Sequence, residues 1–305
     1  SKKNQPMIQL PNCPACNSST FSSFIETTAQ MHTSKERFNF DQCNDCQLVF
    51  LNPRVPLSKL KNYYTSHYLP YRGSEAWGKY ERFVKGSQQK LDMSRVERIK
   101  ESHKTTSNSL LLDVGCGKPS FLKACKDELK CNTLGIDFSD EGWNNSTEDY
   151  ASLDLQVAEI KDLPLDLHPD VITMWHVLEH VPNLEETIKK IEALLNPNGV
   201  LIIAVPNYNS FDAAYYKNYW AAFDAPRHLW HFSRNAMKKI FSDNLISLKT
   251  KPMIFDSFYV SLLSEKNKTG KQNLIKAFLI GLRSNISALK SKEYSSLIYC
   301  YKKRK

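Results

Sequence analysis

Long apolar runs are missing from this 305-residue chain, and none approaches the ~18 residues that a transmembrane helix requires. The first residues also show no apolar segment after Lys2 and Lys3, so we expect no signal peptide and a cytoplasmic location. With 41% hydrophobic and 24% charged residues, the composition lacks the bias of a disordered or collagen-like chain. These absences favour a globular protein with about two domains of ~100–200 residues.

Acidic residues are missing from one long segment, residues 266–292. Residues 266–305 carry eleven Lys and Arg and one acid, whereas residues 1–265 carry thirty basic and thirty-one acidic residues. The net charge of +9 is therefore a C-terminal feature. Because the rest of the chain is balanced, we do not expect a surface adapted to nucleic acid.

The cysteines do not suggest a disulfide framework, because the chain is long and looks cytosolic. Four of the eight form two C-x2-C pairs with 26 residues between them: Cys13, Cys16, Cys43 and Cys46. Two such turns, separated here by strand-like stretches at 20–27 and 37–41, place four thiolates around a Zn²⁺ ion. Four thiolates leave no open position on the metal, so its role would be structural. The alternatives are two redox dithiols or unrelated buried cysteines.

Strand-like apolar segments alternate with helical patterns from Leu110 onward, which predicts a doubly wound parallel sheet. Strands are predicted from 110 and at 133–137, 155–160, 170–175 and 200–205, with a sixth and a seventh within 252–265 and 294–301. Helices are predicted near 83–103 and at 121–129, 184–195 and 234–241, the last with Ser233 as its N-cap.

The first two strands each end in an acidic residue. Asp113 precedes Gly115 and Gly117, and Asp137 follows the second strand, where a carboxylate accepts hydrogen bonds from both hydroxyls of a ribose. A bare G-x-G would also suit a nicotinamide dehydrogenase. Against that, the third glycine of the dinucleotide fingerprint is missing, and the acid before the glycines fits an ammonium group better than a phosphate.

Four segments carry a family resemblance: D-V-G-C-G at 113–117, G-I-D at 135–137, and the stretches 171–183 and 195–202. They resemble class I S-adenosylmethionine-dependent methyltransferases. Within the third, H-V-L-E-H at 176–180 resembles the quinone-pathway O-methyltransferases, and the cysteine module resembles that of sugar C-methyltransferases. The resemblance implies an α/β fold, a seven-stranded Rossmann-like methyltransferase sheet preceded by a small N-terminal zinc ribbon.

The resemblance also implies the cofactor S-adenosyl-L-methionine, its product S-adenosyl-L-homocysteine, and the residues that bind them. The methionine part would meet Asp113, Gly115 and Gly117, the ribose Asp137, the adenine Phe138, Glu159 and Ile160, and the sulfonium Trp175. One position departs from the family pattern, because Pro119 stands where a third glycine is usual. We interpret it as a variant of the loop, since proline is tolerated in the first turn of a helix.

Aromatic residues and histidines follow the fifth strand, including the run D-A-P-R-H-L-W-H at 224–231. Such a mixture suits an amphipathic pocket for the methyl acceptor. Our hypothesis is that His228 or His231 is the general base, with His176 as third choice. The alternative is that each histidine is a structural hydrogen-bonding residue, as we expect for His180.

The predicted organisation is a zinc ribbon over 1–56, a helical connector or lid over 57–108, and a cofactor-binding domain over 109–305. A basic insertion, 266–292, contains apolar residues at helical spacing between 275 and 289. This helix either packs on the domain with its lysines in solvent or contacts an anionic membrane surface or a lipid-like acceptor.

The favoured function is methylation of a small-molecule or lipid-like acceptor on oxygen. Methylation of a sugar carbon is an alternative because of the zinc module. An RNA methyltransferase with a zinc knuckle is another, against which the charge balance argues. The last is a non-enzymatic zinc-ribbon binding protein whose loop at Pro119 no longer holds the cofactor.

Overall fold

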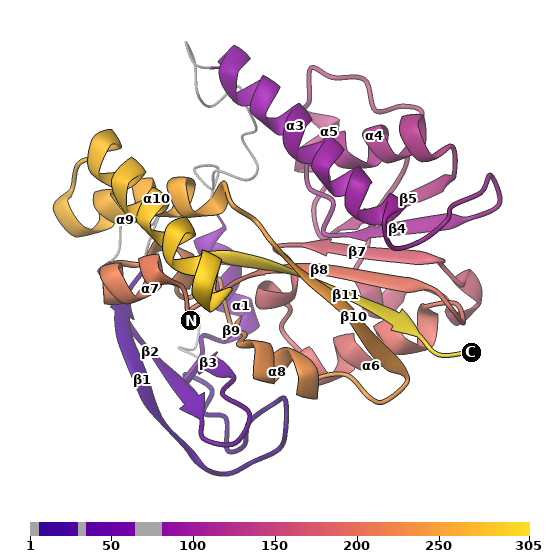
Figure 1. Cartoon of the computed structure of the whole chain (residues 1–305). Helices are drawn as coiled ribbons and strands as arrows, with labels where there is room; N and C mark the ends of the chain where they lie inside the picture. Colours follow the sequence, from indigo (N-terminus) through magenta and orange to yellow (C-terminus); the bar gives the residue numbers. More distant parts are fainter. Residues whose placement is uncertain (1–5, 30–34, 65–80) are drawn as a thin grey trace, which may run out of the picture.

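The computed structural model describes residues 6–29, 35–64 and 81–305, which form a large and a small β-sheet (Figure 1). The large sheet has the order β10-β11-β8-β7-β4-β5-β6. Its strands are β4 (Leu110–Val114), β5 (Asn132–Asp137), β6 (Asp154–Val157), β7 (Val171–Trp175), β8 (Val200–Pro206), β10 (Leu245–Pro252) and β11 (Ser296–Lys303). Strands β4 to β8 pair in parallel, and β11 is antiparallel to both β8 and β10. The predicted Rossmann-like methyltransferase sheet is confirmed.

The central strands are mostly apolar because helices cover both faces of the sheet. All residues of β7 and β8 are buried. One face packs against α3 (Glu81–Lys100) and α4 (Ser120–Leu129), and the other against α6 (Leu184–Leu194).

The remaining helical segments are short or lie near the C-terminus. They are α1 (Leu57–Leu60), η1 (Lys61–Tyr63), α5 (Glu141–Asn144), η3 (Ile160–Asp162), η4 (Leu165–Leu167), η5 (Leu178–His180), α7 (Phe211–Tyr216), η6 (Lys217–Tyr219), η7 (Ala221–Phe223), α8 (Arg234–Lys239), α9 (Asp256–Thr269) and α10 (Leu274–Ser291). The predicted cap of α8 is confirmed, because the Ser233 side chain accepts a hydrogen bond from the Ala236 N–H. Among the described residues, no helix is both long and apolar enough to cross a membrane.

The prediction of a sixth strand within 252–265 is wrong. The strand is β10, which ends at Pro252, and the residues from Asp256 onward form helix α9. The Phe, Tyr and Val residues of this segment favour strands locally. The segment forms a helix instead of a strand because its small residues Ser257, Ser261 and Ser264 recur on one helical face and are buried there.

The small sheet joins the N-terminal module to the rest of the molecule. It contains β1 (Phe21–Thr28), β2 (Arg37–Cys43), β3 (Val49–Leu51) and β9 (Trp230–His231), in that order. Strand β9 comes from the C-terminal half of the chain, and it pairs antiparallel with β3. The predicted strands at 20–27 and 37–41 are thus confirmed, whereas residues 65–80 of the predicted connector lie outside the described residues.

Candidate functional site

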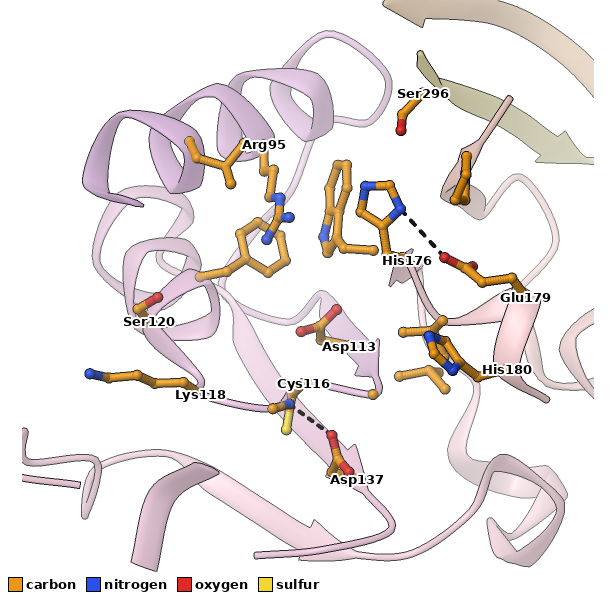
Figure 2. Close-up of a pocket in the computed structure, with 18 of the residues that line it drawn as sticks. Arg95, Asp113, Cys116, Lys118, Ser120, Asp137, His176, Glu179, His180 and Ser296 are labelled. Atoms are coloured by element: carbon orange, nitrogen blue, oxygen red, sulfur yellow. Dashed lines mark hydrogen bonds and ion pairs between the residues drawn. The ribbon is translucent and has the colours of Figure 1, made fainter. Parts of the chain in front are cut away.

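A large cleft opens at the carboxyl ends of β4, β5 and β7, where ligands of doubly wound sheets bind. Its volume is about 3260 Å³, which is room for a nucleoside cofactor and a second molecule. Figure 2 shows side chains from α3, from the loop after β4 and from the turn after β7 around this space.

The glycine loop after β4 is tightly built. Gly115 has φ +70°, and a Cβ there would lie 2.5 Å from Val177 Cγ2, so only glycine fits. The next turn is fixed to β5, because the Gly117 N–H donates to Asp137 Oδ2 at 2.9 Å. Pro119 occupies the N-cap position of α4, where its missing N–H leaves the helix intact. The proline is therefore compatible with a formed loop.

The two acids at the strand ends are buried. Asp113 Oδ1 accepts a hydrogen bond from Thr173 Oγ1 at 2.6 Å. Burial raises the pKa of Asp113 to about 7, although this hydrogen bond and the nearby Arg95 charge act in the opposite direction. Burial likewise raises the pKa of Asp137, against hydrogen bonds from backbone N–H groups. A cationic or hydroxyl-rich ligand would relieve both carboxylates.

Sequence reasoning missed Arg95, which reaches into the cleft from α3 (Figure 2). Its guanidinium carbon lies 4.8 Å from the Trp175 ring centroid, and its Nε has no hydrogen-bond partner among the described residues. A signal was present: Arg95 lies four residues from both Leu91 and Ile99, within the apolar stripe of this helix. A basic residue in such a stripe indicates a function for its charge.

The residues expected at the adenine also line the cleft. Phe138 is 57% exposed and meets Tyr64 edge to face, with ring centroids 5.7 Å apart. Ile160 is buried, whereas Glu159 is exposed and pairs with Lys161 at 2.6 Å. The structure thus brings together the eight predicted cofactor residues around one cleft.

His176 is held by two carboxylates. Its Nε2 lies 3.0 Å from Asp256 Oδ2, and its Nδ1 lies 3.4 Å from Glu179 Oε1. Burial alone would lower the pKa of His176, but the two carboxylates outweigh burial and raise it to about 10. His176 is therefore a cation at neutral pH, which leaves it no lone pair for accepting a proton.

His228 has the opposite character. Its Nδ1 lies 2.7 Å from Ala222 O, an acceptor, so Nδ1 carries the hydrogen and Nε2 keeps its lone pair. Burial lowers the pKa of His228 to about 3. The same Nε2 lies 3.7 Å from Asp224 Oδ2 and 4.0 Å from Glu179 Oε1. An imidazolium formed here would thus have two carboxylates beside it.

His180 and His231 differ from His228 in their surroundings. The His180 ring meets the His228 ring edge to face at 4.5 Å, and its Nδ1 lies 2.9 Å from the Tyr64 hydroxyl. His231 belongs to β9, packs between the rings of Phe40 and Phe223, and is absent from the described lining of the cleft. The geometry therefore favours His228 over His231 as the proton acceptor.

Among the residues that the structure describes, two groups of side chains have the donors of a metal site. The sulfur atoms of Cys13, Cys16, Cys43 and Cys46 lie within 4.8 Å of one another. Cys13 Sγ is 3.5 Å from Cys46 Sγ, and Cys16 Sγ is 3.5 Å from Cys43 Sγ. The ligand atoms of Glu179, His180 and His228 form a second such group within the cleft.

Comparison with known proteins bears on the same half of the chain. The family described as "Methyltransferase domain" matches residues 87–244, more than half of the 305 residues. A ubiquinone biosynthesis O-methyltransferase of Coxiella burnetii is 31% identical over 131 residues, covering 41% of this chain and 56% of that protein. The protein of the same description from Pelagibacter ubique is 31% identical over 114 residues, 36% of this chain and 47% of that protein. The chain spans about half the length of the curated relatives it matches.

Solved structures agree on the fold. Geranyl diphosphate C-methyltransferase from Streptomyces coelicolor A3(2), in complex with Mg²⁺, geranyl diphosphate and S-adenosyl-L-homocysteine, aligns with a TM-score of 0.51 at 15% identity. The alignment covers 74% of this chain and 86% of that chain. At this identity the likeness concerns the arrangement of the backbone.

Proposed function

We propose that this chain, which belongs to the methyltransferase-domain family and is an S-adenosylmethionine-dependent methyltransferase, methylates a hydroxyl oxygen of a small-molecule or lipid-like acceptor. The observation that carries the proposal is the neutral His228, which lines the cleft with a lone pair on Nε2. The relatives of this chain in Coxiella and Pelagibacter are described as O-methyltransferases, in keeping with an oxygen acceptor.

The cleft offers a matching group for each part of the cofactor, which when bound supplies an electrophilic methyl group on a positively charged sulfur. Asp113 would hold the ammonium and Arg95 the carboxylate of the methionine part, since each lines the cleft and is opposite in charge to its ligand. Asp137 would hold the ribose hydroxyls. Trp175 offers an aromatic wall at the end of β7, suited to a cationic sulfur.

Residue His228 would then take the proton of the acceptor. A hydroxyl becomes strongly acidic as its oxygen gains the methyl group, so a base of low pKa accepts the proton late in the reaction. The imidazolium formed would be stabilised by Glu179 and Asp224, both buried. His176 would instead keep Glu179 oriented through the 3.4 Å contact. His228 is therefore our first choice as general base.

The acceptor side of the cleft suggests an apolar substrate. Its lining includes the aromatic and aliphatic residues Phe258, Tyr259, Leu262 and Leu263 of α9, together with Ala221 and Ala222 of η7. Such a lining fits a ring or a hydrocarbon chain better than a nucleotide base attached to phosphates. We therefore consider RNA a weaker candidate for the acceptor than a small or lipid-like molecule. Methylation of a sugar carbon remains the second candidate.

Labelled methyl transfer tests the proposal. The purified chain receives radiolabelled S-adenosylmethionine with a phenol bearing an isoprenoid tail, the same phenol without the tail, a nucleotide-linked sugar, or transfer RNA. We expect labelled methyl ether from the phenols, with a lower KM for the tailed compound. Label only in the sugar or the RNA would overturn the proposed acceptor class. If a chelator abolished the activity and added Mg²⁺ alone restored it, Glu179, His180 and His228 would instead be assigned to the binding of a cation.

The four cysteines of the N-terminal module would hold a structural Zn²⁺. Tetrahedral coordination with Zn–S bonds of ~2.3 Å places sulfur atoms about 3.8 Å apart, close to the 3.5 Å observed for two of the pairs. All four residues are ligands of the type that structural zinc prefers, and together they would leave no coordination position on the metal for a substrate. Reduced thiolates also suit a reducing compartment, so we place the protein in the cytoplasm.

A further inference from the structure

Helix α10 packs on the molecule with its small residues. Its buried positions are Ala277, Ile280, Gly281, Ser284 and Ala288, which form one face of the helix. At Gly281 a Cβ would lie 2.7 Å from Phe258 Cδ1 and 3.0 Å from Phe258 Cα, so α9 and α10 approach too closely for any other residue. The packed face of α10 is therefore set by small side chains.

The large apolar residues of α10 lie on the opposite side. At about 100° per residue they cover an arc of roughly 100° that points away from the packed face. These residues, between 39% and 77% exposed, are Ile275, Phe278, Leu279, Leu282, Ile286 and Leu289. The apolar stripe found in the sequence is thus the solvent-facing one: the helix does pack on the domain, but with its small residues and not with this stripe.

Basic residues border this exposed apolar stripe. Lys276, Arg283 and Lys290 recur every seven residues, which places them along one edge of the stripe. Lys276 pairs with the buried Glu265 at 3.6 Å, and Arg283 lies over the Phe211 ring at 5.0 Å. These contacts hold both basic side chains beside the helix. Because residues 266–292 include no acid, the stripe and its border have one sign of charge.

The stripe begins next to a residue that lines the cleft, because Leu274 directly precedes Ile275. Phe255 at the N-cap of α9, Tyr259 of α9 and Leu274 of α10 line the cleft, and all three are exposed, Phe255 at 75%. Figure 1 shows α9 and α10 lying together at the left of the molecule, off the ends of the strands of the large sheet. A surface that covered the stripe would therefore also lie beside the entrance for the acceptor.

We propose that α10 and the start of α9 form a docking face for an anionic lipid bilayer. The apolar stripe would enter the boundary between headgroups and acyl chains, with the helix lying in the plane of the surface. The basic edge would meet anionic headgroups while the aliphatic stems of its lysines stay among the apolar residues. A second copy of the chain is disfavoured as occupant, since it would bring two basic edges together. This binding goes beyond methyl transfer and does not depend on it.

Vesicle sedimentation tests the docking face with the whole protein. We expect the protein to sediment with vesicles of phosphatidylcholine and phosphatidylserine, and at least about tenfold less with phosphatidylcholine alone. The variant Ile275→Glu/Ile286→Glu changes two exposed residues of the stripe and should lose about tenfold or more of the binding. The matched control Leu165→Glu/Leu248→Glu alters two exposed apolar residues elsewhere on the molecule and should sediment like the unmodified protein.

Further measurements separate this proposal from its alternatives. Lys290→Gln should weaken binding to anionic vesicles and reduce its salt dependence, because the residue borders the stripe. S-adenosylhomocysteine binding should be the same in all variants, which confirms folding and keeps this test independent of the methyl acceptor. Equal sedimentation with and without phosphatidylserine would overturn the proposal. So would a dimer in gel filtration that the variant Ile275→Glu/Ile286→Glu dissociates.

Discussion

The guanidinium of Arg95 lies against the indole of Trp175, 4.8 Å from the ring centroid, and this contact ties helix α3 to the end of β7. The charge of Arg95 is buried beside Asp92, Asp113 and Asp256, and burial lowers its pKa while these acids raise it. A planar cation in such a place is suited to a carboxylate ligand.

Replacing Arg95 by lysine should therefore weaken cofactor binding. Lysine keeps the charge but loses the planar stack and the fork of donors, so we expect Kd for S-adenosylhomocysteine to rise about 10–100-fold. Titration calorimetry measures this. Arg82→Lys, at the exposed start of α3, is the control and should bind normally. Equal affinities for the two variants would remove Arg95 from the cofactor site.

His228 and His231 offer a second comparison within one short segment. His228→Gln should lower kcat by about 10²–10⁴-fold without changing S-adenosylhomocysteine binding, because only the proton acceptor is lost. His231→Gln should leave kcat within a few-fold, since His231 packs in the small sheet. Steady-state kinetics, with the acceptor that the labelling experiment identifies, decide this. Comparable activity in both variants would refute the assignment of the base.

The glycine loop gives a prediction about two glycines. Gly115→Ala forces a side chain into φ +70° and against Val177, so we expect lower stability and loss of cofactor binding. Gly86→Ala, in helix α3 with nothing within 4 Å, should instead stabilise the protein by roughly 0.5–1 kcal/mol. Thermal unfolding and calorimetry test both changes. Normal cofactor binding by Gly115→Ala would show that the loop relaxes.

The cysteine cluster predicts one zinc ion per chain. Elemental analysis should find it in the unmodified protein and in Cys131→Ser, whose cysteine lies elsewhere in the chain. Cys43→Ser should lose the metal and unfold at lower temperature, because metal binding supplies folding energy to small modules. A chain purified with full occupancy despite Cys43→Ser would argue against the tetrahedral site.

His231 gives a prediction for the dependence of stability on pH. Burial lowers the pKa of His231 to about 3, well below ~6.5 for the unfolded chain. The unfolded state therefore takes up a proton first, and stability is lost as pH falls from about 6.5 toward 3. His231→Gln should show a shallower loss between pH 6.5 and pH 4.5, measured as the urea midpoint. A slope equal to that of the unmodified protein would mean that His231 is not neutral in the folded state.

Much of the fold was readable from local patterns. The apolar runs of β4, β7 and β8 are long enough, and the turns between them distinct enough, to predict the strands of a doubly wound parallel sheet. The two C-x2-C pairs predicted a four-cysteine cluster, and Ser233 predicted the start of α8. These signals succeed because each depends on neighbours within one or two turns of chain.

Other features depended on contacts between distant segments. Segment 252–265 contains strand-forming residues, yet from Asp256 onward it forms α9, whose Phe258 packs closely against Gly281 of α10. Arg95 became a candidate ligand only when α3 was placed over Trp175.

The sequence by itself therefore determined the class of fold, the acids at the strand ends and the cysteine cluster, since local spacing specifies each of them. Only the tertiary structure decided between His228 and His231, which lie three residues apart, one lining the cleft and the other in the small sheet. It also decided which face of α10 meets solvent. The reason in both cases is that burial is a property of the neighbours across the fold, and the surrounding residues, not the histidine or the helix itself, set it.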